Sequence, residues 1–208
     1  MKPRVAILIS GRGSNMAALI AAASDPAYPA QIAMVLSNRP DGAGLIAARA
    51  AGIRTEVIDH RDYGRSRDAH EAAIEAVLRG ADIEIVCLAG YMRLLSPLLV
   101  TAREGRMLNI HPSLLPSFPG LNTHARALAA GVKLHGCSVH LVTQDVDAGP
   151  ILAQAAVPVL ASDTEAALAE RVLRQEHRIY PAALAAFVSG LPGPPADATD
   201  SLVNPRAR

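Results

Sequence analysis

Short apolar runs alternate with stretches of helical periodicity along the first half of the chain. Each apolar run lasts only a few residues and ends near a turn-forming residue, which is typical of a buried strand. The expected strands are residues 5–10, 32–37, 55–58 and 83–89. The expected helices are residues 14–23, 44–51 and 67–78, the last with Ala69, Ala73, Ile74 and Val77 at three- and four-residue spacing. This order predicts an α/β fold: a doubly wound, mostly parallel sheet with right-handed crossovers and helices on both faces.

Turn-forming residues are denser in the second half. A short strand, 107–110, leads into a proline-rich loop over residues 111–120. Beyond it we expect a helix at 125–130, strands at 138–143 and 151–159, and a long helix at 164–188 that begins with a cap and an acidic first turn. From Leu191 on there is no periodicity. We therefore expect a single domain over residues 1–190 and a mobile C-terminal tail over residues 191–208.

Composition and charge exclude some function classes. Of 208 residues, half are hydrophobic and 19% are charged, so there is enough apolar material for a buried core. Twenty Lys and Arg against nineteen Asp and Glu give a net charge of +1, and only 3% of residues are aromatic. Because a nucleic-acid surface needs a basic field or a base-stacking platform, no nucleic-acid partner is expected.

The N-terminus and the cysteines bear on the cellular compartment. Two cysteines, Cys87 and Cys137, are too few for a disulfide framework and suit a reducing compartment. The apolar run after Arg4 ends at Gly11, whereas a signal segment needs about 7–15 apolar residues and a membrane span roughly 20. We therefore expect a cytoplasmic protein with no membrane partner.

The segment SGRGSN, residues 10–15, stands between the first expected strand and the first expected helix. Glycines let the backbone approach a ligand, and a helix N-terminus offers N–H groups and a positive dipole end, so this is a candidate phosphate-binding loop. It lacks the third glycine of GxGxxG and the Gly-Lys-Ser/Thr of a P-loop. A glycine-rich turn with a purely structural role is the alternative.

Polar groups also follow the strands of the second half. Asn109 and His111, two residues apart at a strand end, point to the same side at the carboxyl edge of the sheet, where open α/β folds bind ligands. His111 is a candidate acid or base and Asn109 a candidate oxyanion donor, unless the histidine only bonds loop carbonyls. Asp147 either orients a histidine and raises its pKa or bonds its own turn, and the residues alone favour the turn.

Other groups carry weaker signals. None of the seven histidines has HxH or HxxxH spacing, so no metal is expected. No serine lies in a GxSxG elbow, which argues against an α/β-hydrolase. Cys87 stands mid-strand and is expected to belong to the core.

Five segments together resemble the folate-dependent phosphoribosylglycinamide formyltransferases of purine synthesis, which have a Rossmann-like fold. The segments are ISGRGSN (9–15), LAGYMRLLSP (88–97), LNIHPSLLPSFPG (108–120), GCSVHLVTQDVDAGPI (136–151) and QEHRIYP (175–181). They occur in the expected order and span about residues 3–190. The resemblance implies transfer of the formyl group of 10-formyltetrahydrofolate to the amine of glycinamide ribonucleotide, giving formylglycinamide ribonucleotide and tetrahydrofolate.

The resemblance also implies roles for individual residues. Asn109 and His111 would stabilise the oxyanion of the tetrahedral intermediate, and His111 would donate a proton through ordered water. Asp147 would hold the imidazole and raise its pKa. The residues implied for the ribonucleotide are Gly13, Ser14 and Asn15 at the phosphate and Glu176 at the ribose. Those implied for the folate are Arg67, Met92, Arg93, Leu94, Leu95, Gln144, Asp145 and Val146.

The chain departs from the family pattern near the implied folate loop. Leu141 stands where the family more often has an aromatic residue, and Gln144 where it often has an acid, so we expect a different pocket shape but the same reaction. The family also has a cis peptide bond at the position of Leu115–Pro116, which we expect here.

Sister enzymes share the Asn-x-His and Asp groups but use tRNA, water or a sugar nucleotide as acceptor. The tRNA enzyme and the hydrolase would be expected to carry an additional domain, for which this chain has little room, and near-neutral charge argues against tRNA. A catalytically silent nucleotide-binding module is the alternative of a different class. The expected partners are small-molecule substrates, with the protein a monomer or a homodimer.

Overall fold

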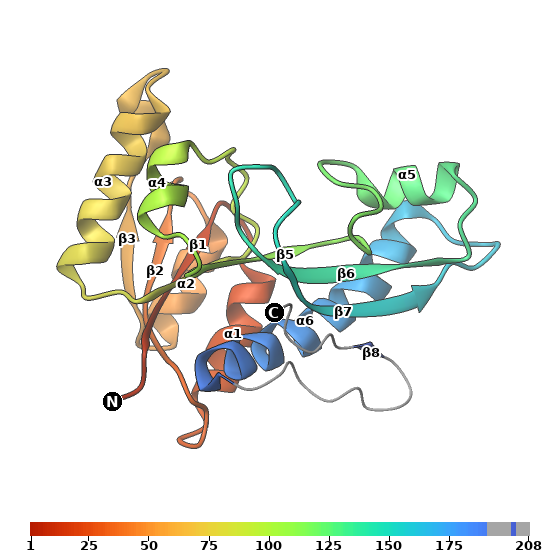
Figure 1. Cartoon of the computed structure of the whole chain (residues 1–208), viewed down its shortest axis with the longest axis horizontal. Coiled ribbons are helices and arrows are strands. Elements are labelled where there is room, and N and C mark those ends of the chain that lie inside the picture. The colour runs from red at the N-terminus through yellow and green to blue at the C-terminus, as the bar shows by residue number, and fades with distance from the viewer. Residues whose placement is uncertain (191–200, 203–208) are drawn as a thin grey trace. The chain divides into compact units, whose positions relative to one another are not determined.

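Five parallel strands form the sheet of the first half of the chain. They are β1 (Arg4–Ile9), β2 (Gln31–Ser37), β3 (Arg54–Val57), β4 (Ile85–Leu88) and β5 (Met107–His111). Their order across the sheet is β3-β2-β1-β4-β5, and β1 is fully buried along residues 5–9. A central strand buried on both faces requires the continuous apolar run seen in its sequence. The predicted doubly wound, mostly parallel sheet is confirmed (Figure 1).

The structure is a computed structural model that describes residues 1–190 and 201–202. The chain divides into two compact units, Met1–Asn109 and Ile110–Arg208, each described by itself below. Strand β5 begins in the first unit and ends in the second.

Helices cover the sheet of the first unit. They are α1 (Ser14–Ala23), α2 (Ala43–Ala50), the 3-10 helix η1 (His60–Tyr63), α3 (Arg67–Gly80) and α4 (Pro97–Ala102). Helix α1 packs on α2, and α3 packs on α4. The chain moves outward from β1 to β3 and then returns past β1 to β4 and β5. Because parallel crossovers are right-handed, the α1–α2 pair and the α3–α4 pair cover opposite faces of the sheet.

Helix α3 corrects one detail of the sequence analysis. Its buried residues are His70, Glu71, Ile74, Glu75 and Leu78, whereas Ala69, at the start of the expected apolar stripe, is exposed. The buried face of α3 is therefore rotated about the helix axis relative to the face that the small apolar residues predict. Rotation is possible because buried hydrogen bonds and an ion pair satisfy the polar side chains on the buried face.

The second unit is built on an antiparallel pair of strands. Strands β6 (Leu134–Leu141) and β7 (Ile151–Pro158) pair along their length, and the long helix α6 (Glu165–Ser189) packs against both (Figure 1). Helix α5 (Thr123–Ala129) packs on α6. As expected, Thr164 caps α6 by accepting a hydrogen bond from the Ala167 N–H. The Leu115–Pro116 peptide bond is cis, which confirms that expectation.

Most expected elements agree with the structure to within a few residues, but α4 and η1 were not predicted. The expected tail, residues 191–208, lies outside the described residues except for Ser201–Leu202, which form β8 antiparallel to β7. Within the described ranges, no helix has both the length and the apolar character that crossing a bilayer requires.

Candidate functional site

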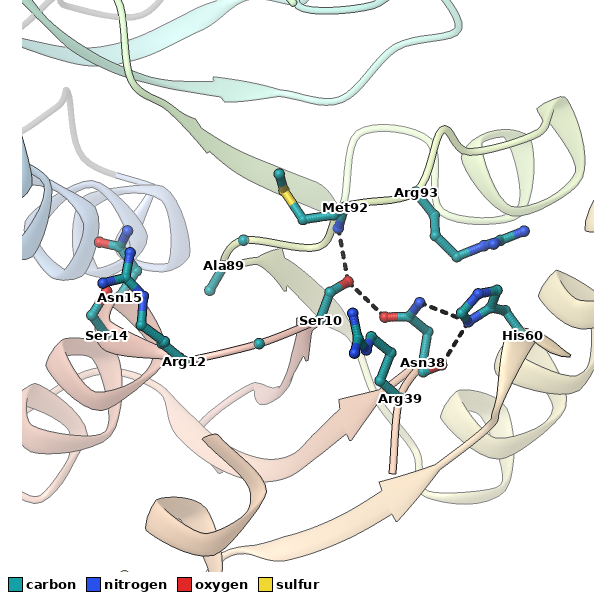
Figure 2. Close-up of a pocket in the computed structure, with 13 residues that line it drawn as sticks. Ser10, Arg12, Ser14, Asn15, Asn38, Arg39, His60, Ala89, Met92 and Arg93 are labelled. Atoms are coloured by element: carbon teal, nitrogen blue, oxygen red, sulfur yellow. Dashed lines mark hydrogen bonds between the residues drawn. The ribbon is translucent and has the colours of Figure 1, made fainter. Parts of the chain in front are cut away.

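A cavity of about 420 Å³ opens at the carboxyl ends of the strands in the first unit. Its walls come from the segments after β1, β2 and β4 and from η1 (Figure 2). The chain leaves β1 toward β2 on one side, while β4 pairs with β1 on the other, so strand order reverses between β1 and β4. Ligands of open α/β sheets bind at such a reversal. The lining residues are Ser10, Gly11, Arg12, Gly13, Ser14, Asn15, Asn38, Arg39, His60, Ala89, Gly90, Met92 and Arg93.

The N-terminus of α1 forms one wall of this cavity. Gly13 precedes the helix in the left-handed conformation, with φ 73°. No side chain caps the helix, and its first turn holds no acidic residue. An uncapped helix N-terminus attracts anions through its dipole and its N–H groups. Gly13, Ser14 and Asn15 are thus placed where the sequence analysis expects phosphate binding.

A chain of hydrogen bonds runs along the floor of the cavity (Figure 2). The Ser10 hydroxyl donates to Oδ1 of Asn38 at 2.6 Å and accepts from the Met92 N–H at 2.8 Å. The Asn38 amide nitrogen lies 3.2 Å from Nδ1 of His60. These buried contacts join the ends of β1 and β2, η1 and the loop after β4.

We expect Gly13→Ala to weaken the binding of a phosphate group at this helix N-terminus. A Cβ here would lie 3.1 Å from the Gly44 Cα and from the Met16 methyl carbon, and alanine disfavours a φ of 73°. The predicted result is a KM for the phosphate-bearing substrate raised about tenfold, with a stability loss on the order of 1 kcal/mol. Steady-state kinetics and urea unfolding measure both.

Gly52→Ala is the matched control for this variant. Gly52 also has a φ of 73°, but a Cβ there would meet no atom within 4 Å, and Gly52 does not line the cavity. It should lose comparable stability and keep its KM. An equal rise in KM for both variants would show that the effect is general backbone strain.

In the second unit, Asp147 lies between two histidines. Its Oδ2 is 3.4 Å from Nδ1 of His111 and its Oδ1 is 3.6 Å from Nε2 of His140. Both histidines are buried, and the Asp147 side chain is 10% exposed. The Gly120 N–H donates to Oδ2 at 2.8 Å. The carboxylate therefore makes contacts beyond its own turn, the alternative that the residues alone did not favour.

The backbone around Asp147 is specialised for this placement. Asp147 itself has a φ of 54°, which L-residues seldom adopt outside turns. Two residues later, a Cβ at Gly149 would collide with the Leu141 carbonyl oxygen. The Asp-Ala-Gly sequence is thus matched to a turn that directs the carboxylate inward.

Burial and charge act in opposite directions on His111. Burial lowers the pKa of His111 below its usual value, although the Phe118 carbonyl and Asp147 both raise it. The expectation that Asp147 raises this pKa thus describes one contribution, which burial outweighs. For Asp147 the balance is reversed: burial raises its pKa, but hydrogen bonds from His140 and Gly120 hold it below its usual value.

The two ring nitrogens of His111 face different acceptors. Nε2 lies 3.1 Å from the Phe118 carbonyl oxygen, and Nδ1 faces Asp147. A neutral imidazole has one N–H and can donate to only one of them, whereas the imidazolium donates to both. The protonated form of His111 therefore has an acceptor for each N–H, and its lowered pKa favours release of the proton.

The other predicted residues fall into separate groups. In the first unit, Met92 and Arg93 line the cavity, whereas Arg67 begins α3, and Leu94 and Leu95 follow in the loop without lining it. Asn109 lies on β5 opposite Leu88 of β4.

In the second unit, Gln144, Asp145 and Val146 are exposed in the β6–β7 loop that leads to Asp147. Glu176 is buried on α6, where its charge acts on the Cys137 thiol. Among the described residues, no group of His, Cys, Asp or Glu side chains is arranged to hold a metal.

Several site residues were not predicted from the sequence. The sequence identifies Ser10 only as part of the loop, and it indicates no site role for Asn38, Arg39, His60 or His140. Asn38 directly follows β2 at the carboxyl edge of the sheet, a position that could have identified it. Nothing in the sequence around His140 indicates a site, because the turn between β6 and β7 is what brings Asp147 next to it.

A second group of histidines makes the second unit sensitive to acid. His135 is buried, with its ring 5.2 Å from that of His124 and 5.9 Å from that of Phe118. Burial, aided by His124, lowers the pKa of His135 to about 4. Below the unfolded pKa of about 6.5 the unfolded chain binds a proton that the folded chain excludes, so stability falls as the pH falls from about 6.5 toward 4.

We therefore expect His135 to cost roughly 3 kcal/mol of unfolding free energy between pH 7 and pH 4. Urea unfolding across this range measures the loss. His135→Phe removes the titrating group. The slope of the unfolding free energy against pH should then decrease by the equivalent of about one bound proton. An unchanged slope in that variant would rule out His135 as the source.

An α/β sheet with a cavity and an uncapped helix N-terminus at its topological reversal, and an imidazole–carboxylate pair after a later strand, are typical of group-transfer or hydrolytic enzymes that use acid–base chemistry. Comparison with known families is more specific. Residues 3–184 match the formyl transferase family, so the chain belongs to the formyl transferases.

Individual relatives agree with this assignment. The chain is 58% identical to the phosphoribosylglycinamide formyltransferase of Brucella melitensis, whose crystal structure superposes with a TM-score of 0.87, covering 92% of this chain and 98% of that one. It is 44% identical to the Escherichia coli (strain K12) phosphoribosylglycinamide formyltransferase, covering 89% of this chain and 87% of that one.

A longer relative is the human trifunctional purine biosynthetic protein adenosine-3. The chain is 54% identical to it over 189 residues, which cover 91% of this chain but 19% of the human protein. The chain therefore spans about a fifth of that relative.

Proposed function

We propose that the protein transfers the formyl group of 10-formyltetrahydrofolate to the amine of 5-phosphoribosylglycinamide, in purine biosynthesis. The products would be formylglycinamide ribonucleotide and tetrahydrofolate. The observation that carries this proposal is the buried His111–Asp147 pair, with Asn109 two residues earlier on β5, in a chain of the formyl transferase family. The names of the bacterial relatives support the acceptor.

The chemistry of the transfer matches the groups present. The amine attacks the formyl carbon, and the carbonyl oxygen becomes an oxyanion that the Asn109 amide and His111 would stabilise. As the bond from the formyl carbon to the folate nitrogen breaks, that nitrogen takes a proton, and the attacking ammonium loses one. His111 would supply the proton directly or through water, and Asp147 would hold the imidazolium.

Binding roles are proposed for the remaining predicted residues. Gly13, Ser14 and Asn15 would hold the phosphate at the N-terminus of α1, and buried Glu176 would accept from the ribose hydroxyls. The folate contacts would be Arg67, Met92, Arg93, Leu94, Leu95, Gln144, Asp145 and Val146. Met92 and Leu94 are 72% and 58% exposed, apolar surface suited to a flat heterocycle, and Arg93 between them suits the carboxylates of the folate.

We also propose that the protein acts in the cytoplasm, on small molecules, as a monomer or homodimer. Its two cysteines are buried and form no disulfide, as suits a reducing compartment, and its net charge of +1 offers no field for nucleic acid.

The test is tetrahydrofolate formation from 10-formyltetrahydrofolate by the purified protein, with and without the ribonucleotide. We expect turnover that requires the ribonucleotide. Turnover of equal rate without it would indicate a hydrolase, and turnover only with a sugar nucleotide would indicate a sister transferase. Either result would overturn the proposed acceptor.

A further inference from the structure

The loop between β4 and α4, residues 89–96, carries four of the proposed folate contacts. Met92 and Leu94 expose their apolar side chains, and Arg93 between them lines the cavity. Apolar side chains on a loop bind a rigid ligand well only if the loop is ordered beforehand, since ordering it on binding would cost affinity. How this loop is held therefore matters for folate binding.

The first attachment of the loop is Ser10. Its backbone N–H donates to the Gly90 carbonyl at 3.1 Å. Its hydroxyl accepts from the Met92 N–H at 2.8 Å (Figure 2). Buried Asn38 accepts a hydrogen bond from the same hydroxyl. The loop is thus fixed at Met92 to the end of β1.

The second attachment is Glu71 of α3. Its Oε1 accepts from the Ser96 N–H and its Oε2 from the Ser96 hydroxyl, both at 2.8 Å, and both residues are 3% exposed. The Ser96 hydroxyl also accepts from the Leu98 N–H and so caps α4. Charge-assisted hydrogen bonds to both groups of one residue are strong and directional. Arg93, Leu94 and Leu95 are therefore held between two fixed points.

Glu75, one turn further along α3, shows that a buried carboxylate here need not act on the loop. It pairs with Arg103, Nε to Oε2 at 2.7 Å, and so fixes the C-terminal end of α4. Both carboxylates are buried on one face of one helix and bind polar groups of the following segment. Of these two carboxylates, only Glu71 binds the end of the loop that carries the proposed folate-binding residues.

We propose that Glu71 is a positioning residue for the folate: acting through Ser96, it holds residues 93–95 in the conformation that binds the co-substrate. This inference rests on the proposed function. Removing the carboxylate frees one end of the loop while leaving the cavity wall of α1 and the His111–Asp147 pair untouched. The effect should therefore fall on folate affinity alone.

The experiment compares Glu71→Ala, Glu71→Gln and Glu75→Gln in the full chain. Steady-state kinetics gives kcat and both KM values, and calorimetry gives the Kd for tetrahydrofolate. For Glu71→Ala we expect the KM for 10-formyltetrahydrofolate and the Kd for tetrahydrofolate to rise about tenfold, with kcat and the ribonucleotide KM within about twofold of wild type.

The other two variants separate positioning from stability. Glutamine can accept from the Ser96 N–H and donate to its hydroxyl, so Glu71→Gln should restore folate affinity to within about threefold of wild type. Glu75→Gln should lower the Tm and leave folate affinity unchanged. If Glu71→Ala fails to fold, Ser96→Ala, which keeps the bond from its N–H, should raise the folate Kd about threefold.

Two outcomes would overturn the proposal. One is a lower Tm with unchanged folate affinity in Glu71→Ala or, if that variant does not fold, in Ser96→Ala. The other is an equal loss of folate affinity in Glu75→Gln. A wild-type protein that binds tetrahydrofolate without using the ribonucleotide would refute the proposed function alone, and the Kd comparison would still decide the role of Glu71. A wild-type protein that binds no tetrahydrofolate would refute both.

Discussion

Replacing His111 with alanine is expected to lower kcat by about a thousandfold or more, because it removes both the proton donor and an oxyanion partner. The KM values for the ribonucleotide and the folate should change by no more than about threefold. The substitution leaves the proposed phosphate-binding residues and the loop after β4 unaltered. Stopped-flow or steady-state assays of tetrahydrofolate formation measure the loss.

The fold of this variant should remain intact. His111 ends β5 and lies beyond the residues of that strand that pair with β4, which are Met107, Leu108 and Asn109. Circular dichroism and tetrahydrofolate binding should therefore match wild type. A His111→Ala protein that is folded and keeps a tenth or more of the wild-type kcat would eliminate His111 as the acid–base group.

Replacing Asp147 with asparagine is expected to have the second-largest effect, lowering kcat by roughly a hundredfold. Asparagine preserves the size of the side chain and an acceptor for the Gly120 N–H, so the change isolates the charge. Because the carboxylate raises the pKa of His111 against the effect of burial, its loss should lower that pKa further. Since His111 acts as a proton donor, the alkaline limb of the pH–rate profile should then move to lower pH.

The titration of His111 followed by NMR is the direct measurement. Glu170→Gln is the control, because it removes an exposed negative charge from the same unit and should leave the titration unchanged. If the histidine titrates identically in wild type and Asp147→Asn, then the carboxylate only shapes its turn.

The parallel sheet could be predicted because its information is local. Each buried strand of the first unit is an apolar run, and the first three crossovers, which hold α1, α2 and α3, have a helical period that the sequence alone displays. Helix α4 escaped prediction because it is only six residues long, which is too short to show a helical period.

The candidate site residues of the two units, each taken by itself, differ in the same way. The loop at Gly13–Asn15 was predictable because a strand, glycines and a helix start are adjacent in the chain. The contact of His140 with Asp147 was not, since it depends on the left-handed backbone at Asp147 and on the register of β6 against β7. Glu71 was missed because a charged residue on a helix normally indicates a solvated face, and only its partner Ser96 makes burial favourable.

The central claim is that the formyl group moves from the folate to the ribonucleotide amine. The most direct test supplies 10-formyltetrahydrofolate with a carbon-13-labelled formyl group, together with 5-phosphoribosylglycinamide, and locates the label by mass spectrometry. The account predicts labelled formylglycinamide ribonucleotide, formed in equal amount to tetrahydrofolate. Label recovered as formate, or retained on the folate with the ribonucleotide unmodified, would contradict it.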